Sequence, residues 1–186
     1  MVKHLRISTG FCAFVCILGW YDSRLLSWFL LGLVCHELGH VVALHIFRIP
    51  IYEVHLRLTG AVIRHGLCSY FQEFICAATG PLANGLLCVF VHRKYPELSM
   101  ISGLMGLANL LPVFPLDGGR MLRTLLLFRL DEEIVSHVME HVAVLICCIL
   151  MGGACCLAVV LQVGVWPIFT ALIILWRVGN ANRASE

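Results

Sequence analysis

The sequence is poor in charged residues. Only 13% of its 186 residues are Asp, Glu, Lys or Arg, and 60% are hydrophobic, whereas about a quarter are charged in an ordinary soluble domain. The net charge of +2 is small and the basic residues are dispersed, which excludes a nucleic-acid-binding protein. Because almost every segment is apolar, the composition predicts an all-α polytopic membrane protein in contact with the lipid bilayer.

The sequence also lacks a Cys-x-x-Cys pair. Nine of its ten cysteines lie in apolar runs, and only Cys68 lies outside them. A small cysteine side chain packs well between helices, so this pattern favours packing over disulfide formation or acylation.

Apolar runs separated by short polar loops predict about six transmembrane helices. These runs cover about 7–21, 25–47, 70–91, 98–111, 138–161 and 165–178. Between the second and third runs, residues 51–63 alternate around Thr59-Gly60 and predict a membrane-associated β-hairpin. An exposed edge of such a hairpin can pair with an extended peptide.

One polar triplet stands inside the second predicted span. His36 and His40 are four residues apart, so both imidazoles lie on one helix face and can bind one metal ion beside Glu37. A charged residue at bilayer depth costs at least about 2.5–3.5 kcal/mol, which makes the triplet a functional-site hypothesis by default. This is the H-E-x-x-H arrangement of zinc peptidases.

The segment after the fourth span contains a third candidate ligand. Prolines and glycines break the helix around Asp117, and irregular backbone at membrane depth is tolerated only where it is buried or lines a cavity. A catalytic zinc takes three protein ligands and a water, so we expect one Zn²⁺ per chain at His36, His40 and Asp117. Glu37 is then the general base. Asn109 is a candidate donor to the substrate backbone or the developing oxyanion.

The basic residues predict the orientation of the chain. With the N-terminus inside, ten of the thirteen Lys and Arg residues fall on the cytoplasmic side, which favours both termini in the cytoplasm. In that topology the histidine motif and the broken segment around Asp117 lie on the same side of the membrane.

These motifs resemble the site-2 protease family of intramembrane zinc peptidases. The resemblance covers about 25–129 and rests on three stretches: His36-Glu37-Leu38-Gly39-His40, Gly80-Pro81-Leu82-Ala83-Asn84, and the segment from Asn109 to Gly119. Without an inserted PDZ domain, the layout is most similar to the stage IV sporulation protein FB branch. The sequence ends soon after the sixth predicted span and has no CBS domain, so regulation through that domain is not implied.

The resemblance implies a single transmembrane peptidase domain over 1–186, with a catalytic core at about 25–129 and accessory spans at 7–21 and 138–178. It implies a zinc metalloendopeptidase that cleaves a transmembrane or membrane-tethered protein, such as a sigma-factor precursor, near the cytoplasmic face. The expected location is the bacterial cell membrane. Expected partners are the substrate, the lipid bilayer and a membrane-protein inhibitor or regulator.

Two other functions compete with this interpretation. A membrane metal transporter would need polar residues along several spans, and the first, fifth and sixth predicted spans offer almost none. A catalytically silent relative that only binds partners would not need Glu37 and all three ligands.

A second histidine pair forms the inverted zincin order H-x-x-E-H, at His137, Glu140 and His141. It lies at a span boundary, and no second proline-broken segment with a carboxylate accompanies it. We therefore interpret it as an interfacial helix face. Elsewhere, His65 is expected to be solvated in the hairpin and Glu73 to be paired at the membrane interface. For Asn84, a helix cross-link and a substrate contact stay equally open.

Overall fold

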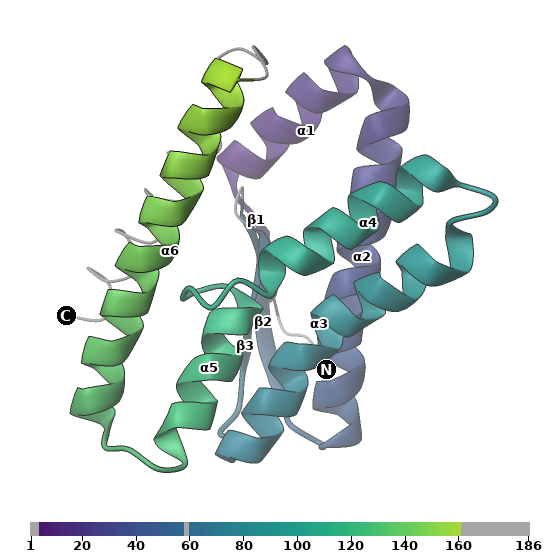
Figure 1. Cartoon of the computed structure of the whole chain (residues 1–186). Helices are drawn as coiled ribbons and strands as arrows, with labels where there is room; N and C mark the ends of the chain where they lie inside the picture. Colours follow the sequence, from purple (N-terminus) through teal and green to yellow (C-terminus); the bar gives the residue numbers. More distant parts are fainter. Residues whose placement is uncertain (1–3, 58–59, 161–186) are drawn as a thin grey trace. The chain divides into compact units, whose positions relative to one another are not determined.

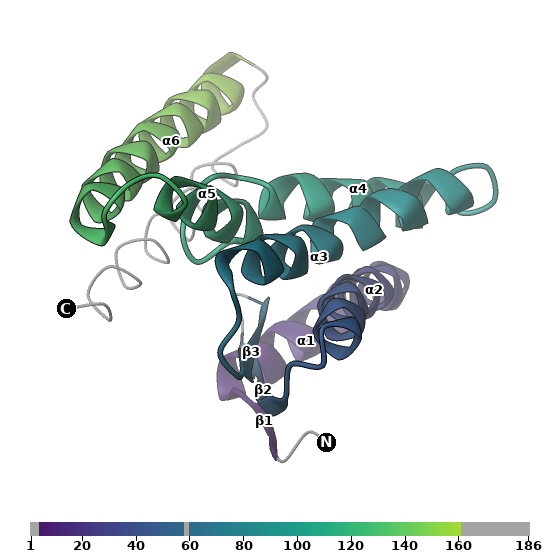
Figure 2. The ribbon, with the colours of Figure 1, turned by 90° about the horizontal axis from the view of Figure 1, so that it is seen from below.

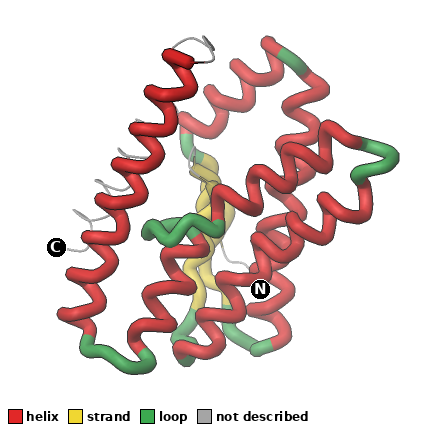
Figure 3. Tube along the Cα trace, in the orientation of Figure 1, coloured by secondary structure: helices red, strands yellow, loops and turns green. Residues whose placement is uncertain are grey.

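The structure is a computed structural model that describes residues 4–57 and 60–160. Helices dominate it, and the strands form one small sheet (Figures 1 and 3). The chain divides into two compact units, Met1–Leu110 and Leu111–Glu186, and each is described by itself. The sixth predicted span, 165–178, lies outside the described residues. The single domain expected over the whole chain stays a prediction.

The first unit contains four helices: α1 (Thr9–Tyr21), α2 (Ser23–Ile46), α3 (Tyr70–Val91) and α4 (Pro96–Asn109). Asp22 separates the first two, because its Oδ1 accepts hydrogen bonds from the backbone N–H groups of Arg24 and Leu25 at 2.8 and 3.0 Å. At the start of α3, Ser69 and Gln72 form a capping box. Within this unit α3 packs against both α2 and α4 (Figure 2).

The three-stranded sheet of the first unit has the order β1-β2-β3. Its strands are β1 (His4–Ile7), β2 (Ile51–Arg57) and β3 (Gly60–His65). β2 and β3 pair antiparallel, which confirms the predicted hairpin, although its turn at 58–59 lies outside the described residues. β1 pairs parallel to β2 and was not predicted, since four residues are too few to show a strand period.

A hydrophobic core joins the sheet to the helices of the first unit. Its buried members are Ala43, Leu44, Ile49 and Cys76, with Phe47, Ile51, Ile63 and Cys68 packed against them. These residues connect the end of α2, the start of α3 and the sheet. The core therefore begins one helical turn after His40 and fixes the end of α2 that carries the histidine motif.

The second unit contains α5 (Asp117–Leu127) and α6 (Glu132–Val160). Its core consists of Val113, Leu116, Ala143 and Cys147. α6 begins six residues before the predicted span at 138–161, with Glu132 and Glu133 in its first turn, where the positive end of the helix dipole stabilises carboxylates.

Three helices among the described residues are long and apolar enough to cross a membrane. They are Ser23–Ile46, Tyr70–Val91 and Glu132–Cys156, and the apolar helix Thr9–Tyr21 is shorter. The first two agree with the spans predicted at 25–47 and 70–91. The prediction of about six spans and of two cytoplasmic termini stays a prediction.

Candidate metal centre

Two histidines meet on the buried face of α2. His36 and His40 are both buried, their Nε2 atoms are 3.2 Å apart and their rings are edge to face. Two nitrogen ligands at 2.0–2.1 Å from a tetrahedral zinc stand about 3.3–3.4 Å apart. The pair therefore has the separation that a shared zinc ion requires.

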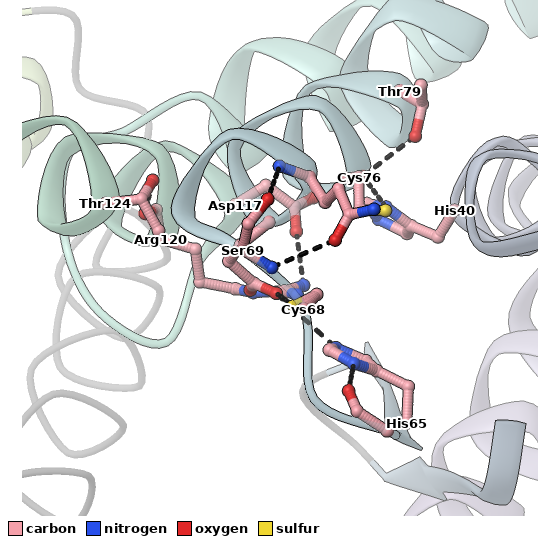
Figure 4. Close-up of polar contacts among 12 residues, drawn as sticks. His40, His65, Cys68, Ser69, Cys76, Thr79, Asp117, Arg120 and Thr124 are labelled. Atoms are coloured by element: carbon pink, nitrogen blue, oxygen red, sulfur yellow. Dashed lines mark hydrogen bonds and ion pairs between the residues drawn. The ribbon is translucent and has the colours of Figure 1, made fainter. Parts of the chain in front are cut away.

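A hydrogen bond at Nδ1 of His40 leaves the Nε2 atom of this residue available to a metal ion. Its Nδ1 is 2.7 Å from the carbonyl oxygen of Cys76, which also accepts a hydrogen bond from the Thr79 hydroxyl at 2.8 Å (Figure 4). A carbonyl oxygen can only accept, so Nδ1 carries the proton and Nε2 presents its lone pair. Metal-binding histidines are oriented by contacts of this kind.

Asn84 links α3 to the other histidine. It is fully buried, with 0% exposure, and its Nδ2 is 3.3 Å from His36 Nδ1, while its Oδ1 has no hydrogen-bond partner among the described residues. Turning the amide over places Oδ1 at the same position, where it accepts a proton from His36 Nδ1 and leaves Nε2 bare for a metal. The contact supports the helix cross-link for Asn84.

Glycine residues let α2 and α3 approach one another closely at the histidine pair. A Cβ on Gly39 would lie 2.4 Å from the Thr79 carbonyl oxygen, and a Cβ on Gly80 would lie 2.3 Å from His40 Nε2. Both distances are far inside van der Waals contact. Small residues at these positions are therefore required for α3 to form one side of the histidine site.

The remaining predicted site residues lie on three helices. Glu37 is half-buried on α2 next to His36. Asp117 is buried at the first position of α5, with Arg120 Nη1 3.5 Å from its Oδ1. Asn109 ends α4 and donates from Nδ2 to the Met105 carbonyl oxygen at 3.0 Å. Their roles as base, third ligand and substrate donor stay predictions.

The inverted histidine pair lies on the outer face of α6. His137, Glu140 and His141 are exposed, whereas Val135 and Met139 are buried on the opposite face. His141 Nδ1 donates to the His137 carbonyl oxygen at 2.7 Å. Within the described part of the chain, these residues belong to no group of potential metal ligands, and the interfacial helix face stays a prediction.

Comparison with known proteins identifies the family. Residues 95–152, which include Asn109 and Asp117, match Peptidase family M50. Over 158 residues the chain is 30% identical to the stage IV sporulation protein FB of Bacillus subtilis, a match covering 78% of this chain and 54% of that protein. The chain carries a segment of peptidase family M50 at residues 95–152. A zinc metalloprotease of Methanocaldococcus jannaschii is 31% identical over 108 residues, covering 51% of this chain and 32% of that protein.

The fold agrees with this family. The structure of a site-2 protease from Methanocaldococcus jannaschii matches with a TM-score of 0.70 at 19% identity, over 95% of this chain and 89% of that chain. This confirms the predicted all-α polytopic fold. With its three candidate spans and these relatives, the chain is an integral membrane protein. It spans about half the length of the sporulation protein and about a third of the metalloprotease.

The histidine pair fits the metal of the family. One relative is a zinc metalloprotease, and the separation of the two Nε2 atoms together with the bonded Nδ1 of His40 suits zinc. His36 and His40 are therefore the residues of α2 that would hold Zn²⁺.

We expect Gly80→Ala to disable the histidine site without unfolding α3. The new methyl group would overlap His40 Nε2 and lie 2.9 Å from His36 Cε1, although alanine is the better helix former by about 1 kcal/mol. A displacement of about 1 Å at a reacting centre costs on the order of a hundredfold in rate. Zinc content and cleavage of a membrane-tethered substrate measure the effect.

Gly85→Ala is the matched control, because a Cβ there meets nothing within 4 Å. It carries the same gain in helix propensity on the same helix and should retain zinc and activity. If both variants behaved like the wild type, the close approach of α3 to the histidines would be contradicted.

We expect Asn84→Leu to weaken zinc binding by about 10–100-fold, the usual cost of losing a side chain that orients a metal ligand. Asn84→Asp keeps an oxygen acceptor for His36 Nδ1 and should restore much of the affinity. The measurement is competition for zinc against a chromophoric chelator.

Ser102→Ala provides the control for packing. The Ser102 hydroxyl donates to the backbone carbonyl oxygen of Asn84 at 3.1 Å, so its loss disturbs the same helix contact without touching the amide. Equal weakening in Ser102→Ala and Asn84→Leu would show that helix packing, and not the amide, sets the affinity.

Proposed function

We propose that this protein is a zinc-dependent intramembrane endopeptidase that cleaves a transmembrane or membrane-tethered protein near the cytoplasmic face. The observation that carries the proposal is the buried pair of His36 and His40 within a helix of membrane-spanning length, with Nε2 atoms 3.2 Å apart. The M50 match over 95–152 and the two protease or sporulation relatives support it.

In the proposed site, His36, His40 and Asp117 hold one zinc ion. When bound, zinc lowers the pKa of its water to about 7 and polarises the peptide carbonyl. Glu37, next to His36 on α2, would accept a proton from the attacking water and give it to the leaving amine. Asn109 donates to the substrate backbone or to the developing negative charge.

The sheet offers a way to present the substrate. β2 is paired on both sides, whereas β3 is at an edge of the order β1-β2-β3. A peptide bond is hydrolysed in an extended segment, and an extended segment can add to an open strand edge through backbone hydrogen bonds. We therefore propose that β3 aligns the substrate before cleavage.

The proposed substrate class is a membrane-associated precursor such as that of a sigma factor, regulated by a membrane-protein inhibitor. The similarity to a sporulation protein supports this class. The distribution of Lys and Arg supports a site on the cytoplasmic side, with both termini there. Transport of metal ions is disfavoured, because the buried positions of α6 among the described residues are apolar: Val135, Met139, Ala143, Cys147 and Ala154.

The experiment is to incubate the purified protein in liposomes with a membrane-tethered candidate substrate and identify the products by mass spectrometry. We expect one discrete cut near the cytoplasmic end of the substrate span, present with the wild type and absent with Glu37→Gln. Products that are the same with both proteins would contradict the proposed function.

A further inference from the structure

A second group of potential metal ligands lies at the junction between the sheet and α3. His65 ends β3, Cys68 lies in the following loop and Glu73 is in the first turn of α3. One ligand atom from each residue lies within 4.8 Å of the others, and all three residues are half-buried. The prediction of a solvated His65 was wrong, because its side chain is only 15% exposed, and that of Glu73 is only 20% exposed.

The three donor atoms converge at distances suited to a metal ion. Glu73 Oε2 lies 3.6 Å from His65 Nε2 and 3.1 Å from Cys68 Sγ. Ligands at 2.0–2.3 Å around a tetrahedral zinc are separated by about 3.3–3.7 Å. The first distance is within this range, and a shift of a few tenths of an ångström at the sulfur brings the second into it.

A backbone contact turns the imidazole of His65 toward the other two ligands. Its Nδ1 lies 2.9 Å from the Gly66 carbonyl oxygen (Figure 4). Since that oxygen can only accept, Nδ1 carries a proton, and Nε2 lies toward Glu73. His40 is held in the same way by the Cys76 carbonyl oxygen, so both sites share the orientation typical of metal-binding histidines.

The loop that carries the thiol is held firmly. Cys68 packs against the core formed by Ala43, Leu44, Ile49 and Cys76, and the Gly66 N–H donates to the Pro50 carbonyl oxygen at 2.9 Å. The capping box that starts α3 follows directly. The ligands are therefore placed by the fold and not by a free loop.

We propose that His65, Cys68 and Glu73 bind a second zinc ion, separate from the histidine pair of α2. A thiolate, an imidazole and a carboxylate together suit zinc and not magnesium or calcium, which take only oxygen ligands. The fourth position is filled by water. Because the ligands come from β3, the loop and α3, the ion fastens the sheet to the helix.

The same distances also fit a metal-free arrangement, in which the Cys68 thiol donates to Glu73 and the carboxylate pairs with protonated His65. The two arrangements differ in what happens when a metal is offered. Only the proposed site converts the thiol into a metal-bound thiolate.

The test is a Co²⁺ titration of the full-length protein, purified in detergent and stripped of metal with a chelator. Thiolate bound to cobalt gives a charge-transfer band in the near ultraviolet, and the proposed ligands on α2 and α5 include no thiol. We expect the band to reach the same final amplitude, that of one thiolate-bound cobalt per chain, in the wild type and in His36→Ala, and to be lost in Cys68→Ser. Cys12→Ser, which removes an exposed cysteine of α1, should leave it unchanged.

Zinc content gives a second measurement that does not depend on peptidase activity. We expect two zinc ions per chain in the wild type and one in Cys68→Ser or His65→Ala, with the helical content unchanged by circular dichroism. A missing band, a band that persists in Cys68→Ser, or equal zinc content in the wild type and Cys68→Ser would overturn the proposal.

Discussion

Replacing Glu37 with Gln should abolish cleavage and leave zinc bound. Glutamine has the shape of glutamate but cannot accept a proton from water, and general base catalysis contributes about 10²–10⁴-fold to a rate. Glu37 lies beside His36 on α2. The Nε2 atoms of His36 and His40 have the separation that a shared zinc ion requires, and Nδ1 of His40 is hydrogen-bonded to the Cys76 carbonyl oxygen. The measurement is the cleavage rate of a membrane-tethered substrate together with zinc content by mass spectrometry.

Glu97→Gln is the matched control. Glu97 is exposed at the start of α4, where its carboxylate contacts Trp28 and Arg24 at 3.1 Å, and an exposed ion pair contributes little to stability. This variant should cleave at the wild-type rate. Normal cleavage by Glu37→Gln would show that Glu37 is not the general base. Loss of zinc from this variant would indicate that Glu37 is a metal ligand.

Replacing Asp117 with Asn should cost both zinc binding and cleavage. As the proposed third ligand, the carboxylate supplies negative charge to the ion, and the amide that replaces it supplies none. Loss of an orienting residue already weakens metal binding by about 10–100-fold, so loss of a direct ligand should exceed about 100-fold. Zinc affinity by chelator competition and cleavage in liposomes measure the effect.

Two controls separate ligand loss from local disturbance. Asp131→Asn changes an exposed carboxylate just before α6 and should have no effect. Arg120→Gln removes the cation 3.5 Å from Asp117 but keeps the carboxylate, so zinc binding should persist. Wild-type affinity in Asp117→Asn would mean that another residue is the third ligand.

Much of the first unit was predictable because its signals are local. The four-residue spacing of His36 and His40 requires only a helix to bring the rings together, and α2 lies within two residues of the predicted span. The alternation on both sides of Thr59-Gly60 was enough for the β2–β3 hairpin, since a hairpin pairs neighbours in sequence.

The parts that were not predictable depend on contacts between distant segments. β1 pairs with a strand almost fifty residues later. The contact of Asn84 with His36 exists only because α3 packs against α2. The cluster of His65 with Glu73 is close in sequence, but it depends on how the loop after β3 turns into α3. A sequence pattern shows which face of a helix is polar, but not which residue of another helix will meet it.

The glycine contact between α2 and α3 also has a consequence for the choice of ion. At Gly80 the space beside His40 Nε2 is too small even for a methyl group, so the backbone of α3 excludes ligands from that side. Calcium needs six to eight oxygen ligands, and magnesium keeps an octahedral shell with several waters. Two imidazoles beside the backbone of α3 favour instead an ion that is stable with four ligands. The glycine therefore contributes to selectivity against the abundant hard cations.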